Sequence, residues 1–154
     1  MKINKFIFLI ILISLVSCGY EPIYTKKGSL NILINKIETK GNKIINRKII
    51  SLAKIKENNN ESYAYNLNLN SQKNITVVAK DKSGNASVYK TTINVELSLK
   101  NPKNQNAIVK TKNFNSSFSY NNIKNKFDLQ EYQKNIEQNL INRIVEEITI
   151  FLNS

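Results

Sequence analysis

Several residue types on which enzymes depend are missing from this chain or nearly so. It has no histidine, no tryptophan, one cysteine and four glycines among 154 residues. Without histidine, and with a single thiol, neither the Ser-His and Cys-His nucleophile systems nor the usual zinc sites can be assembled. The glycines lie far apart, which excludes a glycine-rich phosphate loop. The composition therefore predicts a protein that is not an enzyme and holds no metal.

Acidic residues are also scarce, with 11 against 23 basic residues and a formal charge of +12. The two aspartates, Asp81 and Asp128, occupy positions typical of a turn and of a helix start. Glu146 and Glu147 are adjacent, so on a helix they diverge by about 100°, as on an exposed charged face. The basic excess favours an anionic partner. Codon bias is the alternative, because lysine, asparagine and isoleucine are all abundant and all have A/T-rich codons.

The N-terminus has the pattern of an export signal. Lys2 and Lys5 precede an apolar run over residues 6–16. This run is too short to cross the core of a bilayer, which requires a helix of about 20 residues. Leu15 and Ser17 stand before Cys18 at the spacing of the bacterial lipobox, which this segment resembles. That resemblance implies cleavage before Cys18 and a covalent lipid on its sulfur. The alternative is a soluble secreted protein in which Cys18 is incidental.

These boundaries divide the chain into a lipoprotein signal peptide (1–17), a lipidated tether (18–28) and one α/β domain (29–154). The charge becomes +10 once Lys2 and Lys5 leave with the signal. No disulfide can form, because the only cysteine carries the lipid. Stability must therefore come from core packing or from a partner.

Alternation and helical spacing predict the elements of the domain. Strands are expected over residues 29–38, 63–79 (one long strand or two short ones), 87–99 and 107–120, the last with a slipped, bulge-like pattern. Turns are expected at 81–85 and 101–104. Helices are expected over residues 43–56 and from 128 to the end. The order β-α-β-β-β-α predicts an α+β two-layer sandwich, in which two helices cover one face of a mixed four-stranded sheet.

Both helices carry a start signal and an apolar face. Asn42 is the expected N-cap of the first, and residues 128–131 resemble a capping box with Asp128 as the cap. The expected face of the first helix comprises Ile44, Ile45, Ile49, Leu52 and Ala53. The expected core stripe of the second comprises Leu129, Tyr132, Ile136, Leu140, Ile144 or Val145, Ile148, and Phe151 or Leu152.

The mature start, Cys-Gly-Tyr-Glu-Pro-Ile-Tyr over residues 18–24, resembles the opening of the LptE family of lipopolysaccharide (LPS)-assembly lipoproteins. The element order, and the Ser/Tyr-rich segment 116–120 before a long terminal helix, are similar too. The resemblance implies a protein anchored by lipid to the outer membrane on its periplasmic side. It implies a place in the lumen of the LptD β-barrel, help in assembling that barrel, and assistance in LPS delivery.

Five lysines are candidates for LPS contact. Lys80, Lys82 and Lys90 flank the turn at 81–85 and would gather at one end of the sheet. Their amines could bind the phosphates of lipid A there. Lys110 and Lys112 share a strand face and would extend the patch if that strand is adjacent. The alternative is that these lysines only keep exposed strands soluble and unpaired.

Two other functions stay open at this point. One is an accessory lipoprotein of another outer-membrane assembly complex, without glycolipid contact. The other is a periplasmic lipid carrier on a tether, which would need a deep apolar pocket under the sheet. Nucleic acid is excluded as a partner by the exported compartment.

Overall fold

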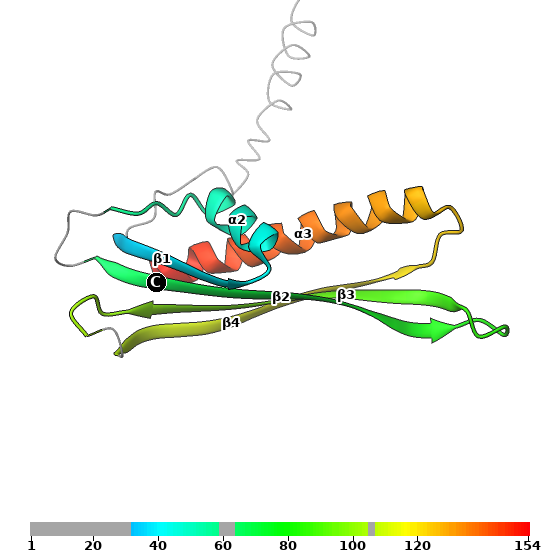
Figure 1. The fold of residues 1–154 in the computed structure, drawn as a ribbon, viewed down its shortest axis with the longest axis horizontal. Coiled ribbons are helices and arrows are strands. Elements are labelled where there is room, and N and C mark those ends of the chain that lie inside the picture. Colours follow the sequence, from blue (N-terminus) through cyan, green and yellow to red (C-terminus); the bar gives the residue numbers. More distant parts are fainter. Residues whose placement is uncertain (1–31, 59–63, 105–106) are drawn as a thin grey trace, which may run out of the picture.

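The computed structural model describes residues 32–58, 64–104 and 107–154. Its elements are β1 (Ile34–Gly41), α2 (Lys43–Leu52), β2 (Tyr65–Lys80), β3 (Ala86–Lys100), β4 (Ile108–Asn121) and α3 (Lys126–Asn153). Both helices lie on the same side of the sheet (Figure 1). The predicted α+β sandwich with the order β-α-β-β-β-α is therefore confirmed. The signal segment and the tether lie outside the described residues.

The sheet has the strand order β1-β2-β3-β4. β1 runs parallel to β2 through the α2 crossover, whereas β2–β3 and β3–β4 are antiparallel neighbours. β1 pairs with β2 only as far as Ser71, although β2 continues to Lys80. Over that remaining stretch, β3 is the one described strand that borders β2.

The segment 63–79, for which the sequence predicts either one long strand or two short ones, forms a single strand. The reason is that its side chains alternate between the two faces of the sheet. Leu67 and Leu69 are buried against the helices, and Ser71 and Lys73 continue the same face. Ser71 is fully buried, where its hydroxyl donates to the carbonyl of Asn42 at 3.2 Å. The polar residues therefore stay in the sheet because each finds a partner, which removes the penalty for burying them.

The core lies between this face of the sheet and the two helices. Its strand residues are large aliphatic side chains and one aromatic ring: Leu67, Leu69, Ile93, Val95, Leu97, Leu99 and Phe114. The predicted irregularity in the last strand is present, as a register shift where Leu99 and Lys100 meet the beginning of β4. The first strand begins at Ile34 and runs on to Gly41, past its expected end at residue 38.

The α2 helix begins as expected and ends earlier than expected. The Asn42 side chain accepts hydrogen bonds from the backbone N–H groups of Ile44 and Ile45, both at 3.1 Å, which confirms the N-cap. At the other end, the N–H of Ile55 donates to the carbonyl of Ile50, and Lys54 has a φ of 55°. This is a Schellman termination, and it ends the helix at Leu52 instead of residue 56.

The expected apolar face of α2 was too wide. Ile45, Ile49 and Ala53 are buried, but Ile44 and Leu52 are exposed. The three buried residues are spaced by four and form a narrow stripe on this short helix. Residues 44 and 52 are each adjacent in sequence to a member of the stripe, so their side chains point about 100° away from it. Asn46 is buried beside that stripe, where its amide donates to the carbonyl of Lys40 at 2.7 Å.

The predicted capping box of the last helix is wrong. The N-cap of α3 is Asn125, whose side chain accepts a hydrogen bond from the N–H of Phe127 at 2.9 Å. Asp128 lies inside the first turn, where a carboxylate faces the positive end of the helix dipole. The core stripe is confirmed from Ile136 onward, while Tyr132 is 40% exposed and Leu129 only partly buried.

Candidate functional site

The predicted lipid site, Cys18, lies outside the described residues. Lipidation therefore stays a prediction. The surfaces that the described chain offers to partners include the basic β2–β3 hairpin and the open face of the sheet.

The hairpin between β2 and β3 is closed by one aspartate. Asp81 Oδ1 accepts from the backbone N–H groups of Ser83 and Asn85, at 2.8 and 2.9 Å. Gly84, at a φ of 82°, supplies the left-handed residue that the turn requires. The single carboxylate of the turn is thus engaged by the backbone, and Lys80 and Lys82 beside it are exposed. The predicted turn therefore carries a local excess of positive charge.

Lys90 adds to this charge from β3. It pairs with Thr76 on β2, so it lies about 13 Å from Lys80 along the strand direction. Its side chain points to the face of the sheet away from the helices, because the core residues of β3, Ile93, Val95, Leu97 and Leu99, all have odd numbers. None of Lys80, Lys82 and Lys90 forms an ion pair with a described residue. The three amines are therefore available to an anionic partner.

Lys110 and Lys112 do not join this group. They share a strand face, as expected, but Lys110 pairs with Leu99, whereas Lys90 pairs with Ser119, about 30 Å further along β4. Both point toward the helices. The amine of Lys110 donates to the carbonyl of Phe151 at 2.8 Å, at the end of α3, and both amines lie over the Phe151 ring. The structure thus places these two lysines at the opposite end of the sheet, as partners of the helix C-terminus.

The face of the sheet away from the helices is polar over the middle of the strands. Its residues are Asn66, Asn68, Asn70, Gln72, Asn74, Thr92, Asn94, Glu96, Ser98, Asn113 and Asn115. Two shallow hollows lie on it, one between Glu38 and Lys100 and one between Gln72 and Asn115. The amide oxygen of Asn68 is buried without a hydrogen-bond partner among the described residues. The asparagines at alternate strand positions were the sequence signal for this surface.

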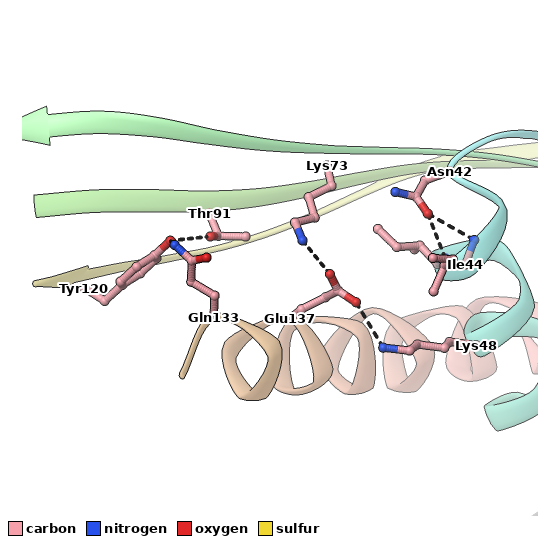
Figure 2. A network of polar contacts seen from close by, with 9 residues as sticks. Asn42, Ile44, Lys48, Lys73, Thr91, Tyr120, Gln133 and Glu137 are labelled. Atoms are coloured by element: carbon pink, nitrogen blue, oxygen red, sulfur yellow. Dashed lines mark hydrogen bonds and ion pairs between the residues drawn. The ribbon is translucent and has the colours of Figure 1, made fainter. Parts of the chain in front are cut away.

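Beneath the sheet, one carboxylate joins three elements. Glu137 on α3 accepts from the amine of Lys73 on β2 at 2.6 Å and from that of Lys48 on α2 at 3.0 Å (Figure 2). Burial acts to raise the pKa of Glu137, but the hydrogen bonds and charges of the two lysines outweigh it and lower that pKa. Nearby, the Tyr120 hydroxyl is hydrogen-bonded to Thr91 and to Gln133. These contacts hold the helices in place.

The described residues contain no arrangement suited to a metal ion, since no three His, Cys, Asp or Glu side chains lie together. Neither helix in the described part of the chain has the length and apolar character needed to cross a membrane.

Solved structures share this fold. The rare lipoprotein B of Shewanella oneidensis is 13% identical, with a TM-score of 0.52, over 74% of this chain and 93% of that one. A putative lipoprotein of Caulobacter crescentus is 16% identical, with a TM-score of 0.50, over 76% and 87%. No family model and no curated protein matches the sequence. The fold that the resemblance implied is therefore the fold found, and it is shared with rare lipoprotein B.

Proposed function

We propose that this protein is a lipid-anchored outer-membrane lipoprotein that occupies the lumen of an LptD-type β-barrel, helps that barrel assemble and assists LPS delivery. The observation that carries the proposal is the fold shared with rare lipoprotein B. The Cys18 lipobox and the LptE-like start at residues 18–24 also support the proposal. This support is independent of the fold, because these residues lie outside the described part of the chain. The protein acts by binding and positioning, without catalysis.

The surface chemistry suits a polar lumen. The interior of a large outer-membrane barrel is lined by polar side chains, since lipid-facing and lumen-facing residues alternate on its strands. The open face of the sheet offers asparagine and glutamine side chains, each of which can both donate and accept hydrogen bonds. A plug with this face needs no large apolar patch to be held in place.

The filled core argues against the lipid-carrier alternative. Phe114, Ile141 and Ile144 are among the large side chains that are fully buried between the sheet and the helices. The hollows of the open face lie on the other side of the sheet, and most of the residues that line them are polar or charged. An acyl chain would have to displace core side chains to enter, which costs several kcal/mol of packing.

For LPS contact we propose Lys80, Lys82 and Lys90, which cluster at the hairpin and are free of ion pairs with described residues. Lysine binds phosphate as a point charge, so exposed amines at one end of the sheet suit the phosphates of lipid A. Lys110 and Lys112 are not part of this proposed site, because the end of α3 engages Lys110 and its Phe151 ring lies under both amines.

Purification of the full chain from detergent extracts tests the barrel partnership. We expect a large β-barrel protein to accompany it in stoichiometric amount, and acylated Cys18 to appear in the mass spectrum of the mature N-terminus. A Cys18→Ala variant is the matched control for the anchor, since it should lose the acyl mass. Recovery of the wild-type chain alone, across several mild detergents, would contradict the barrel role; an unmodified Cys18 would contradict the anchor.

A further inference from the structure

Strand β2 is longer than the neighbour that borders it. The last β1 pairing joins Gly41 to Ser71, after which Asn42 donates its N–H to the carbonyl of Ser71 at 2.9 Å and the chain turns into α2. β2 continues to Lys80 with β3 on its other side, and Figure 1 shows it extending well past the end of β1. The place beside β2 that β1 fills near the middle of the sheet is therefore vacant, among the described residues, toward the hairpin.

The alternation of a strand identifies which backbone groups face this vacant edge. The carbonyl of Ser71 points toward β1, and the N–H and C=O of successive residues point to opposite sides. The backbone groups of Lys73, Ile75 and Val77 therefore point outward, while those of the intervening residues pair with β3. The regular pairing with β3 persists through Val77 and is interrupted only after it. Such a row of unpaired groups is a template for another strand.

The side chains along this edge are unusual for an unprotected strand. Ile75 and Val77 are 43% and 47% exposed, and Val78, at the bulge, is 56% exposed. The outer edge of β1, in contrast, carries Lys36, Glu38 and Lys40, the kind of charged residues that discourage pairing. A strand added at this edge would bury the apolar side chains and would hydrogen-bond to the open backbone groups.

Charge indicates what that strand contains. Lys80, Lys82 and Lys90 surround this end of the sheet, and the carboxylate of Asp81 is engaged by the turn. A second copy of this chain would bring the same cations together, which is unfavourable. An acidic segment with apolar residues at alternate positions would neutralise them and cover Ile75 and Val77.

We propose that the edge of β2 over Lys73–Val77 docks an extended acidic segment of a partner protein, which adds to the sheet in line with β1. This proposal rests on the proposed function, because the partner is the barrel or a protein bound to the barrel. It adds that β2 is the element of this chain that makes the contact. Main-chain hydrogen bonds supply the binding, and the lysines select for acidic sequence.

The test uses the mature, lipid-anchored chain in detergent and two eight-residue peptides, one alternating valine with glutamate and one alternating valine with lysine. Hydrogen exchange is followed at the amides of Lys73, Ile75 and Val77. We expect the acidic peptide to slow exchange at these three amides at least tenfold and the basic peptide to leave it unchanged. The same result with both peptides, no protection at all, or protection by LPS micelles alone would overturn the proposal.

Substitutions at one residue separate the backbone from the side chain. Ile75→Pro removes an outward N–H, a change that edge strands tolerate, and should abolish protection by the acidic peptide. Ile75→Thr is the matched control, since it keeps the N–H and suits a strand, and should bind within a few-fold of wild type. If the proline variant does not fold, Lys80→Glu with Lys82→Glu serves instead and should reverse the peptide preference. Unchanged binding by Ile75→Pro, or by the double variant Lys80→Glu with Lys82→Glu, contradicts the proposal.

Failure of this docking site is distinguishable from failure of the proposed function. If a barrel accompanies both wild type and Ile75→Pro, and the edge amides of the wild type exchange freely in that complex, the docking site is wrong and the barrel role stands. If the acidic peptide docks but no barrel accompanies the chain, the barrel role is wrong and the docking site stands. Sedimentation that shows a dimer lost in Ile75→Pro would overturn the docking proposal in favour of self-pairing.

Discussion

Replacing Glu137 with glutamine should weaken the attachment of both helices to the sheet. The substitution keeps the shape of the side chain but places a neutral amide between the amines of Lys73 and Lys48, which now lie 2.6 and 3.0 Å from its oxygens. Only 14% of the Glu137 side chain is exposed, so water replaces the lost charge poorly. A hydrogen bond to a charged group contributes about 1.5–3 kcal/mol.

The two lysine side chains are 31% and 28% exposed, and they can turn partly toward solvent when their partner is lost. We therefore expect a combined loss near the range for one such bond, about 2–3 kcal/mol, from a total stability of about 5–15 kcal/mol. Urea unfolding of the lipid-free chain should show this as a midpoint lower by about 1 M.

The exposed pair Lys36–Glu38 provides a matched control, because its N–O distance of 2.9 Å is similar but both side chains face solvent. Glu38→Gln should leave the midpoint unchanged within error. A Glu137→Gln loss below about 0.5 kcal/mol, which is within the range of surface pairs, would refute the argument that burial makes this bridge strong.

The pH dependence has a definite sign. The folded-state pKa of Glu137 is lowered, so its contribution is complete above the unfolded carboxyl pKa, about 4.3, and is lost as pH falls through the lower folded value. Wild-type stability should therefore fall more steeply than that of Glu137→Gln below about pH 4. Parallel pH profiles would contradict the assigned protonation state.

Three further changes test the fold and the basic hairpin. Gly41→Ala should strongly destabilise the domain in urea, because Gly41 has a φ of 78° and an added Cβ would meet the carbonyl oxygen of the facing strand at 2.0 Å; an unchanged midpoint would contradict this packing. Ile144→Asp would bury an unpaired charge at a fully buried position and cost several kcal/mol, so soluble expression of the lipid-free chain should fail. Replacing Lys80, Lys82 and Lys90 with glutamine should weaken LPS binding and flatten its salt dependence while the melting temperature holds, and wild-type binding would exclude the hairpin.

Local patterns were sufficient for the elements and their order. The alternation of β3 predicted residues 87–99, and the strand spans Ala86–Lys100. Asn42 was recognisable as a cap because capping depends on a side chain and the N–H groups two and three residues later. The same reasoning misplaced the start of α3, since Asn125 and Asp128 are both good cap residues and local pattern does not choose between them.

Helix faces and the lysine cluster depended on contacts that are distant in sequence. Ile44 and Leu52 fit an apolar pattern, yet they are exposed because α2 is short and presents one narrow stripe to the sheet. Lys110 and Lys112 fit a basic patch, yet the antiparallel register carries them to the other end of the sheet from Lys90. Register is a long-range property, so it is absent from any local window.

The sequence by itself was sufficient for the element order β-α-β-β-β-α, because that order depends on residue type and local spacing. The export signal and the lipobox depend on the same kind of local pattern and stay predictions. Only the tertiary structure decided that Glu137 joins α3 to α2 and β2, and that β2 extends beyond the end of β1. Both follow from where strands pair and how far each runs, and those lengths are set by packing between segments that lie far apart along the chain.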